Sequence, residues 1–468
     1  QSNYCMFTAN PNTNDFKQTW ENIYHITHYK VPAYKAIADE SIKPSLEKGQ
    51  VYHRTYDSDF VVENMGGDGG YNNQAWTDSD ETITINYVKD VSFYIKKLDK
   101  FQAQLPLQIR KARKAMNNLF LQLDSDVLAT AYAGAGSTVD DGSIGGTSGN
   151  GITLSVGNIQ NVFASSEMNL RLANVIYDPS ATFSGDFKLD RMNTMPVAII
   201  SAQMYNILVQ YLGGKTTVLG DNVSNSGYVG KYFGFNLYVS NNLTWTGNLI
   251  LATNPTAGDT FTLLYGISNK IGGTPTSQAV TFTFRATPAV AGEVVIASTA
   301  AKTVTNLVNA LNAPYTLIAN TADTGYHPLV QSSLTTTQQK LFNGLTATQT
   351  NPASASGTTL TLQINGQGNV PVSQSMTAGA NIWTLAKQVQ HNIFGVNKSI
   401  SVVIQYGPEF EILQSNPASG SNNSGRVGWD FVTWFTYGIK VFNDQSPQLI
   451  DVQVRTDSFT TNPVNTFN

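Results

Sequence analysis

This sequence of 468 residues has few charged side chains. Asp, Glu, Lys and Arg together make up 13% of it, whereas they form roughly a quarter of an average soluble protein. A freely diffusing monomer usually depends on surface charge for its solubility. The scarcity of charge therefore favours a protein whose surfaces face other protein, or a secreted β protein. The formal net charge of −4 argues against a dedicated nucleic-acid binder, but it suits the wall of a container that holds nucleic acid.

Cysteine is nearly absent as well. Cys5 is the single cysteine, so an intramolecular disulfide and a thiolate metal cluster are excluded, which agrees with assembly in a reducing cytoplasm. No apolar run approaches the ~20 residues that span a bilayer, and no signal-peptide pattern opens the sequence. The first residue is Gln1 and not Met, which suggests either trimming or proteolytic maturation.

Motifs of catalysis and of metal binding are missing too. The sequence contains no P-loop, dinucleotide fingerprint, HExxH or EF-hand loop, and no G-x-S-x-G nucleophile elbow. His25 and His28 are spaced like two ligands on one helix face, but Glu21 is the one carboxylate at a useful distance. We therefore interpret the pair as structural, and we predict no metal, no cofactor and no enzymatic activity.

Two acidic groups receive the same interpretation. Asp124 and Asp126 lack the glycine and glutamate of a calcium loop. The other group consists of Asp78, Asp80 and Glu81. We interpret it as a solvated acidic turn.

What the sequence does contain is an extended hairpin followed by a long helix. Residues 51–63 have an extended pattern, Gly66–Gly70 form a glycine-rich tip, and apolar residues then alternate from Ile83 to Ile95. From Pro106 to about Tyr132 the apolar residues recur every three or four positions, which predicts a helix roughly 40 Å long. An arm on a rigid rod is typical of a protein that assembles with other copies.

Four cations occupy the first two turns of this helix: Arg110, Lys111, Arg113 and Lys114. Cations near a helix N-terminus oppose its macrodipole, at a cost of up to ~1 kcal/mol each when exposed. They either contact a neighbour's carboxylates or packaged phosphate, or they are a solvated face, and the sequence favours neither. Lys89, Lys96 and Lys97 on the preceding strand are weaker candidates for an isopeptide crosslink between subunits.

The rest of the chain predicts a mixture of helices and strands. Residues 133–151 are rich in Gly, Ser and Thr and predict a flexible loop. Ser155 or Asn158 is a candidate cap for a helix ending near Asn174, and Ser201 caps another helix that follows a buried strand.

The pattern of amino acids changes near residue 253, which indicates an insertion. The strand pattern GDTFTLL at Gly258 is followed by a helix from Thr299, and GTTLTLQ at Gly357 by a helical pattern from Thr377. We therefore predict that residues 253–427 are an inserted domain of two similar modules, 253–313 and 355–413.

The order of these segments resembles the major capsid protein of tailed double-stranded DNA bacteriophages, which has the Hong Kong 97 fold. The string GYVGKYFGFNLYVSNNL, from Gly227, is similar to the family's recurring G-x-x-G-x-x-x-G-F-x-V/L-Y-x-S-x-N-L segment. The resemblance implies an α+β chain, whose expected parts run as follows: N-terminal arm 1–50, E-loop 51–100, P-domain 101–185 with spine helix 106–132, A-domain 186–252 and 428–468, and β-rich α+β insertion 253–427.

The resemblance further implies a shell protein. Pentamers and hexamers would close into an icosahedron around phage DNA bound without sequence specificity, in the virion, after assembly in the host bacterial cytoplasm and without a membrane. Portal protein, scaffold and protease would be assembly partners, and auxiliary capsid or head-fibre proteins are further candidates. Contacts between subunits would include the E-loop tip, formed by Gly66, Gly67, Asp68, Gly69 and Gly70.

Three alternatives stay open on the residues alone. An encapsulin-type nanocompartment would share the fold, and a tail, sheath or fibre protein would share the Thr- and Asn-rich β segments. A secreted carbohydrate-active enzyme or adhesin would explain the low charge and the tryptophans Trp383, Trp429 and Trp434, but it predicts an acid pair in a cleft that the sequence does not show.

Overall fold

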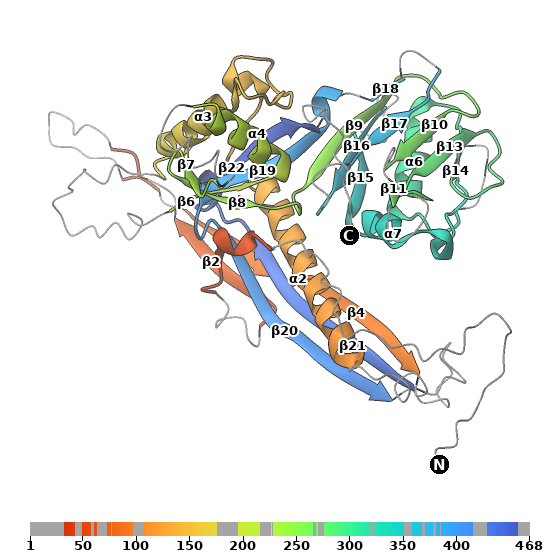
Figure 1. Cartoon of the computed structure of the whole chain (residues 1–468), viewed down its shortest axis with the longest axis horizontal. Coiled ribbons are helices and arrows are strands. Elements are labelled where there is room, and N and C mark those ends of the chain that lie inside the picture. Colours follow the sequence, from red (N-terminus) through yellow and green to blue (C-terminus); the bar gives the residue numbers. More distant parts are fainter. Residues whose placement is uncertain are drawn as a thin grey trace.

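The computed structural model shows two lobes side by side above a long stalk (Figure 1). It describes residues 32–42, 49–57, 60–62, 73–75, 77–96, 107–175, 195–215, 226, 228–264, 268–269, 276–318, 321, 323–350, 358–366, 370–377, 381–383, 385–414 and 428–456. The predicted tip Gly66–Gly70, the histidines His25 and His28, and most of the predicted N-terminal arm lie outside these residues.

The stalk is helix α2 (Leu107–Ala133) lying along a sheet of order β1-β20-β21-β4. Its strands are β1 (Ala38–Asp39), β4 (Tyr87–Lys96), β20 (Ile400–Gln414) and β21 (Gly428–Lys440). Leu123 and Val127 on the apolar face of α2 are fully buried and share a core with Phe435 and Tyr437 of β21. The helix predicted over 106–132 is therefore confirmed to within one residue.

A separate hairpin leaves the top of the stalk. Strands β2 (Val51–Asp57) and β3 (Asp78–Thr84) pair antiparallel along their whole length, as the sequence predicts. The segment predicted as the E-loop, 51–100, divides in the structure, because β4 pairs with β21 inside the stalk. Tyr87 of β4 stacks on Tyr437 at 5.0 Å between ring centroids, and Phe93 stacks on Phe431 at 5.1 Å. These ring contacts stabilise β4 in the stalk sheet and not in the hairpin.

The central lobe combines a sheet with helices α3 (Ile159–Leu172) and α4 (Ala202–Gly213). Its strands are β5 (Ser137–Val139), β6 (Pro196–Ile200), β7 (Lys231–Tyr232), β8 (Phe235–Val239), β19 (Val389–Val396) and β22 (Leu449–Arg455). The backbone N–H of Met204 donates to Ser201 Oγ at 3.1 Å, so the predicted cap of α4 is confirmed. The amide of Asn158 instead holds the preceding turn, since its Oδ1 accepts the N–H of Ser155 at 2.8 Å.

One prediction about this lobe is wrong. Residues 133–151 are not a structureless loop, because β5 pairs with β22 and Asp140 caps the short helix η3 (Asp141–Ile144). Helix α3 packs in this lobe, since the ring of Phe163 lies edge-on against Phe394 of β19 at 5.1 Å.

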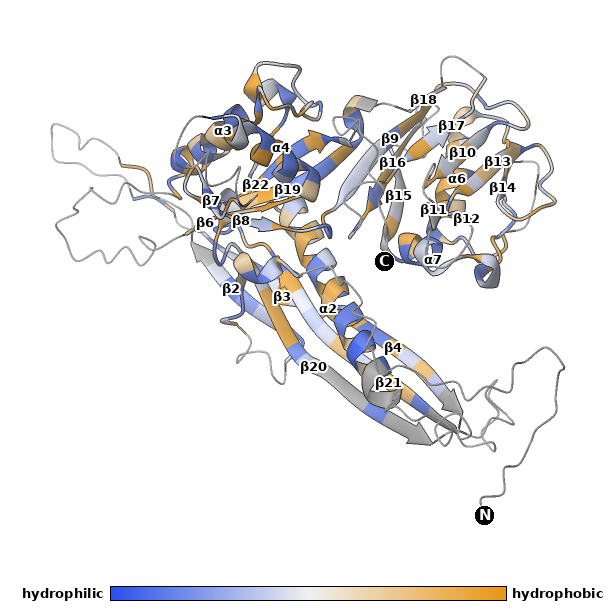
Figure 2. Cartoon of the chain, in the orientation of Figure 1, coloured by the Kyte–Doolittle hydropathy of each residue, from blue (hydrophilic) through white to orange (hydrophobic). Residues whose placement is uncertain are grey.

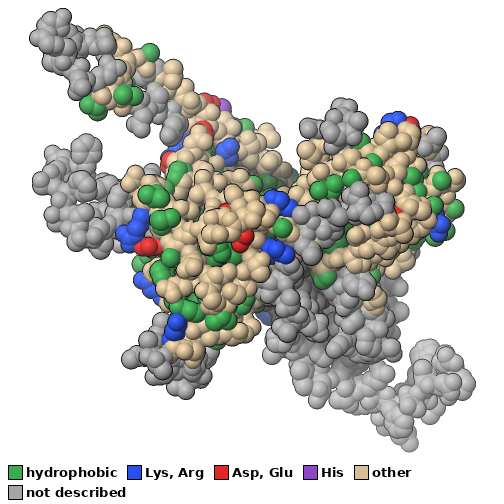
Figure 3. Space-filling model, turned by 90° about the horizontal axis from the view of Figure 1, so that it is seen from above, with side chains coloured by type: hydrophobic (Ala, Val, Ile, Leu, Met, Phe, Trp, Pro, Cys, Tyr) green, Lys and Arg blue, Asp and Glu red, His purple; other side chains and the backbone are tan. Residues whose placement is uncertain are grey.

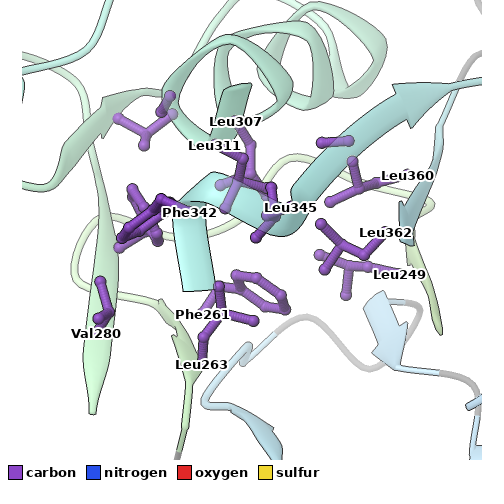
Figure 4. Packing of buried hydrophobic residues seen from close by; sticks show 14 of the residues in the cluster. Leu249, Phe261, Leu263, Val280, Leu307, Leu311, Phe342, Leu345, Leu360 and Leu362 are labelled. Atoms are coloured by element: carbon purple, nitrogen blue, oxygen red, sulfur yellow. The ribbon is translucent and has the colours of Figure 1, made fainter. Parts of the chain in front are cut away.

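The insert lobe contains helices α6 (Ala300–Asn312) and α7 (Thr336–Gly344) between two sheets. Strand β9 (Trp245–Leu251) borders this lobe and connects it to the central lobe, since it pairs with β16 on one side and with β19 on the other. The strands of the lobe are β10 (Thr260–Leu263), β11 (Ser268–Asn269), β12 (Thr276–Ser277), β13 (Val280–Arg285), β14 (Glu293–Val295), β15 (Leu345–Gln349), β16 (Thr359–Ile364), β17 (Val372–Gln374) and β18 (Asn381–Trp383). Figure 4 shows Leu307 and Leu311 of α6 pointing into a core with Phe261 and Leu362. This lobe therefore has a hydrophobic core of its own.

The predicted second module, residues 355–413, is wrong. The chain after Thr377 forms β18, the short helix η5 (Leu385–Lys387) and β19 instead of a helix. Every residue of β19 is buried, and the strand pairs with β6 on one side and β22 on the other. A strand in the middle of a sheet completes the backbone hydrogen bonds of both neighbouring strands. The free energy of this pairing and burial exceeds what the local helix propensity of the segment contributes.

The boundaries of the insertion change accordingly. Strands β19 and β20 belong to the central lobe and the stalk, so the inserted lobe ends near residue 383 and not at 427. The closing segment is also divided, because β21 lies in the stalk and β22 in the central sheet. The segment 428–468, predicted as one part of the A-domain, is therefore shared between two sheets.

Candidate assembly surfaces

The hairpin is attached to the body through a small root. Ile83 and Ile85 are buried against Val403 and Phe442 in a cluster of four. Arg54 Nη2 donates to Asp444 Oδ2 at 2.6 Å, and its guanidinium carbon lies 5.0 Å from the centre of the Phe442 ring. The arm is thus fixed at the turn that follows β21.

Farther out, the described part of the hairpin exposes apolar side chains. Phe60, Val61 and Val62 are 67%, 70% and 97% exposed. The side chain of Gln74 accepts the N–H of Val61 at 2.8 Å and donates to its carbonyl oxygen. The Gln74 amide thus supplies the backbone hydrogen bonds that a neighbouring strand would supply to Val61. The apolar side chains stay exposed, where a partner can cover them.

The cationic end of α2 is also exposed. Lys111, Arg113 and Lys114 face solvent, whereas the side chain of Arg110 lies outside the described residues although its backbone is in the first turn of the helix. The Lys111 ammonium lies 6.0 Å from the centre of the Phe93 ring. Burial, and then the charge of Lys114, lower the pKa of Lys340 on α7.

The described strands of the hairpin and the cationic turns of α2 lie far apart in the molecule. The hairpin and the first turns of α2 lie at opposite ends of the stalk (Figure 1). Figure 2 shows that the part of α2 near the lobes carries the apolar residues, whereas its distal half is largely hydrophilic. One copy therefore presents two different surfaces in two directions.

Asp124 has a role that the sequence did not reveal. Its carboxylate is fully buried and accepts the N–H groups of Ala33 and Tyr34 at 2.8 Å each. Its second oxygen accepts from Asn242 Nδ2 at 2.9 Å. Burial, with the charges of Glu40 and Asp124, raises the pKa of Tyr34 to about 12. The sequence signal for this role was the position of an acidic residue on the apolar face of the predicted helix, because a buried carboxylate requires hydrogen-bond donors.

Asp126 makes a similar connection between α2 and β21. The hydroxyl of Tyr437 donates to Asp126 Oδ2 at 2.5 Å, and Gln122 Nε2 donates to Oδ1 at 2.9 Å. Burial raises the pKa of the carboxyl group above 3.8, and the bond from Tyr437 opposes this. Burial also raises the pKa of Tyr437.

A third buried polar group joins the two lobes and the stalk. His391 Nδ1 lies 2.9 Å from both oxygens of Asp451, and its Nε2 lies 2.9 Å from Thr246 Oγ1. This order of atoms resembles the hydroxyl, imidazole and carboxylate of a hydrolase. His391 is, however, only 3% exposed, and the ring of Tyr132 covers it at 3.9 Å. We therefore assign these residues a structural role.

The other candidates are placed as follows. Lys89 lies 5.8 Å from the Tyr87 ring on the α2 side of the sheet, and the side chains of Lys96 and Lys97 lie outside the described residues, as do those of Trp383 and Trp429. Trp434 stacks on Tyr406 at 4.8 Å. Within the described ranges, no three His, Cys, Asp or Glu residues gather as metal ligands, and no helix has the length and apolarity to cross a membrane.

No protein-family model and no curated protein matches this sequence. Solved structures do match. A structure from Mycobacterium phage Che8 is 11% identical and has a TM-score of 0.50, over 94% of this chain and 97% of that one. This chain has the Hong Kong 97 fold.

Two further structures cover most of this chain. The capsid structure of the cyanophage P-SCSP1u gives a TM-score of 0.43 at 11% identity, over 96% of this chain and 98% of that one. The mature capsid of bacteriophage PhiM1 gives 0.43 at 7% identity, over 94% and 91%. At such identities the likeness concerns the fold alone.

Proposed function

We propose that this chain is a major capsid protein that self-assembles into the icosahedral head shell around a phage double-stranded DNA genome. The observation that carries the proposal is the β2–β3 arm on a Hong Kong 97 fold. A two-stranded hairpin is at best marginally stable in water, and this one is rooted in a cluster of four buried residues while Phe60, Val61 and Val62 are exposed. An adjoining copy would cover these side chains.

The parts of the fold then receive their assembly roles. The β2–β3 hairpin is the E-loop, with Gly66–Gly70 as its contact tip, and α2 is the spine helix of a P-domain formed by the stalk. The central lobe is the A-domain, and residues 253–383 are the inserted domain. The segment before Tyr34, which Asp124 anchors, continues as the N-terminal arm.

The proposed partners follow from this assignment. Copies form pentamers and hexamers, since an arm that contacts a different surface on the next copy makes a heterologous interface, and such interfaces close into rings. Portal protein, scaffold and protease act during assembly in the bacterial cytoplasm, and auxiliary or head-fibre proteins bind the finished virion. The packaged DNA is held without sequence specificity, as the net charge of −4 allows.

The test is direct observation of assembly. The purified protein is concentrated at neutral pH and imaged by negative-stain electron microscopy, with light scattering for the mass in solution. Closed shells of uniform size support the proposal, whereas a monomer under all assembly conditions contradicts it. Expression in uninfected bacteria with and without the phage packaging proteins separates a capsid from an encapsulin-type compartment, because only a capsid fills with DNA when they are present.

A further inference from the structure

Four polar side chains form a row across the large sheet, one on each of four adjacent strands. Gln363 of β16 is the direct antiparallel partner of Thr246 of β9. His391 of β19 lies on the other side of Thr246, and Asp451 of β22 lies beyond His391. Figures 1 and 3 show the central and insert lobes side by side, and this sheet runs through both. The row therefore crosses the join between the two lobes.

Thr246 has the contacts of an activated nucleophile. His391 Nδ1 lies 2.9 Å from both oxygens of Asp451, and its Nε2 lies 2.9 Å from Thr246 Oγ1. A carboxylate at Nδ1 fixes the tautomer in which Nε2 accepts a proton, and a hydroxyl that donates to such a base becomes nucleophilic. His391 is 3% exposed, which excludes a substrate from outside. A side chain that already lies beside the hydroxyl needs no access.

The side-chain amide of Gln363 is the group within reach of this hydroxyl. Directly opposite residues of an antiparallel pair have their side chains on one face, with β-carbons roughly 4.5–5.5 Å apart. The hydroxyl of Tyr132 donates to Gln363 Oε1 at 3.4 Å, and the Tyr132 ring lies 3.9 Å from that of His391. Burial, and then the charge of Asp451, raise the pKa of Tyr132, so this hydroxyl keeps its proton. The base and a donor to the carbonyl oxygen thus lie on the same face of the sheet.

We propose that Thr246 and Gln363 form a covalent ester by a reaction within the folded chain. Thr246 Oγ1 attacks the amide carbon Cδ of Gln363, and its proton passes to His391 Nε2. The hydroxyl of Tyr132 stabilises the oxyanion that forms. The C–N bond then breaks as His391 returns the proton to the nitrogen, and ammonia leaves. The products are one ester and one ammonia, so the reaction needs no oxidant or cofactor.

The ester fixes the insert lobe to the body of the molecule. Strand β16 belongs to the insert lobe, whereas β9 also pairs with β19 of the central lobe. The crosslink closes a long loop that contains α6 and α7, and a covalent closure of this kind limits the freedom of the unfolded chain. Both Thr246 and Gln363 are half-buried, which leaves ammonia a path to solvent.

Peptide mass spectrometry of the full chain tests the crosslink. The protein is kept folded at neutral pH, then denatured and digested with trypsin, which releases Thr246 in peptide 232–270 and Gln363 in peptide 341–387. We expect one species that contains both peptides and is lighter than their sum by one ammonia. Fragmentation should place the bond between residues 246 and 363. The joined peptides are the readout, and not the intact mass, because an N-terminal glutamine can also lose ammonia.

Variants assign the reaction to these side chains. Thr246→Ser keeps a hydroxyl and is expected to form the crosslink, whereas Thr246→Val and Gln363→Glu are expected to give two separate peptides. His391→Gln removes the base and should slow crosslinking at least ~100-fold, measured as the joined fraction against time after refolding. Thr361→Val is the matched control, because Thr361 and Asn248 are the next hydroxyl–amide pair on the same two strands. It should form the crosslink as the wild type does.

Circular dichroism first shows that each variant is folded. Two separate peptides from the folded wild type would overturn the inference, as would a crosslink that persists in Thr246→Val. Recovery of residue 363 as glutamate would also overturn it, because water and not Thr246 would then be the nucleophile. The readout does not depend on shell formation, so a chain that carries the ester but forms no shells refutes only the proposed function.

Discussion

At the scale of single residues, three buried acids of this chain act as joints. Asp124 connects α2 with Ala33 and Asn242, Asp126 connects α2 with Tyr437, and Asp451 holds His391 between the lobes and the stalk. Each carboxylate has several donors, as a buried charge requires. Removing one of them leaves buried N–H groups without an acceptor, which costs more than the bond itself contributes.

Asp124→Ala is expected to destabilise the monomer by about 3–5 kcal/mol, since it strips three donors of a buried charged acceptor. Urea unfolding followed by circular dichroism measures the loss. Asp124→Asn keeps an acceptor for the N–H groups of Ala33 and Tyr34 but turns an amide NH₂ toward Asn242. It should therefore lose less stability than Asp124→Ala. A loss of stability from Asp124→Asn as large as that from Asp124→Ala would refute the assigned contact with Ala33 and Tyr34.

The raised pKa of Asp126 predicts a pH dependence of the unfolding free energy that is opposite in sign to that of an ion-paired carboxylate with a lowered pKa. Burial raises its pKa in the folded state above the 3.8 of the unfolded chain, so the folded state binds the proton more tightly. Its contribution to the unfolding free energy is therefore present below 3.8 and is lost as pH rises through the raised pKa.

The measurement compares the wild type with Asp126→Asn by urea unfolding between about pH 3 and 7. The stability of Asp126→Asn relative to the wild type should increase as pH rises. Asp90→Asn, on the exposed face of β4, serves as the matched control and should show no such trend. A difference between Asp126→Asn and the wild type that is independent of pH would contradict the prediction.

At the scale of elements, the hairpin is expected to be dispensable for folding and necessary for assembly. Replacing Tyr56–Asp80 by a two-residue turn keeps Arg54 and Glu81, which are paired across the strands and anchor the root. The monomer should unfold at nearly the wild-type urea concentration, because the buried root remains. Closed particles should be absent from electron micrographs.

The control for this deletion shortens another part of the surface. Residues 351–357, between β15 and β16, are replaced by Asn-Gly, and particles should form as in the wild type. Normal-sized particles from the hairpin deletion would contradict the role of the arm.

At the scale of the whole molecule, the insert lobe should be removable if the cut respects the sheet. Leu251 of β9 is the direct antiparallel partner of Asn381 in β18, so replacing residues 252–380 by an Asn-Gly turn joins the two strands as a hairpin. Trp245, Leu249 and Leu251, all fully buried against the lobe, become exposed. The variant with Leu249→Thr and Leu251→Thr should stay soluble and form shells that dissociate at lower urea concentrations than the wild type.

A second excision provides the contrast. Removing residues 253–427, the insertion that the sequence predicted, also deletes β19 and β20, which hold the central sheet and the stalk together. That protein should aggregate in expression trials with no soluble monomer. Soluble, shell-forming protein from the longer excision would show that these strands are not essential to the body.

Features that depend on neighbours along the chain follow from the amino-acid order alone. The period of apolar residues determined helix α2, Ser201 determined the start of α4, and the order of segments determined the Hong Kong 97 fold class. Each of these signals is local, because helical periodicity and capping act over a few residues.

The placement of the strands in the second half of the chain depends on long-range packing. The sequence predicted a helical pattern from Thr377 that reaches into residues 389–396, but pairing and burial between β6 and β22 make these residues a strand. The partners of Asp124 lie about ninety positions away, and Tyr87 leaves the hairpin for a ring 350 positions later in the chain. Such pairings depend on what the folded chain brings together, and no local pattern encodes them.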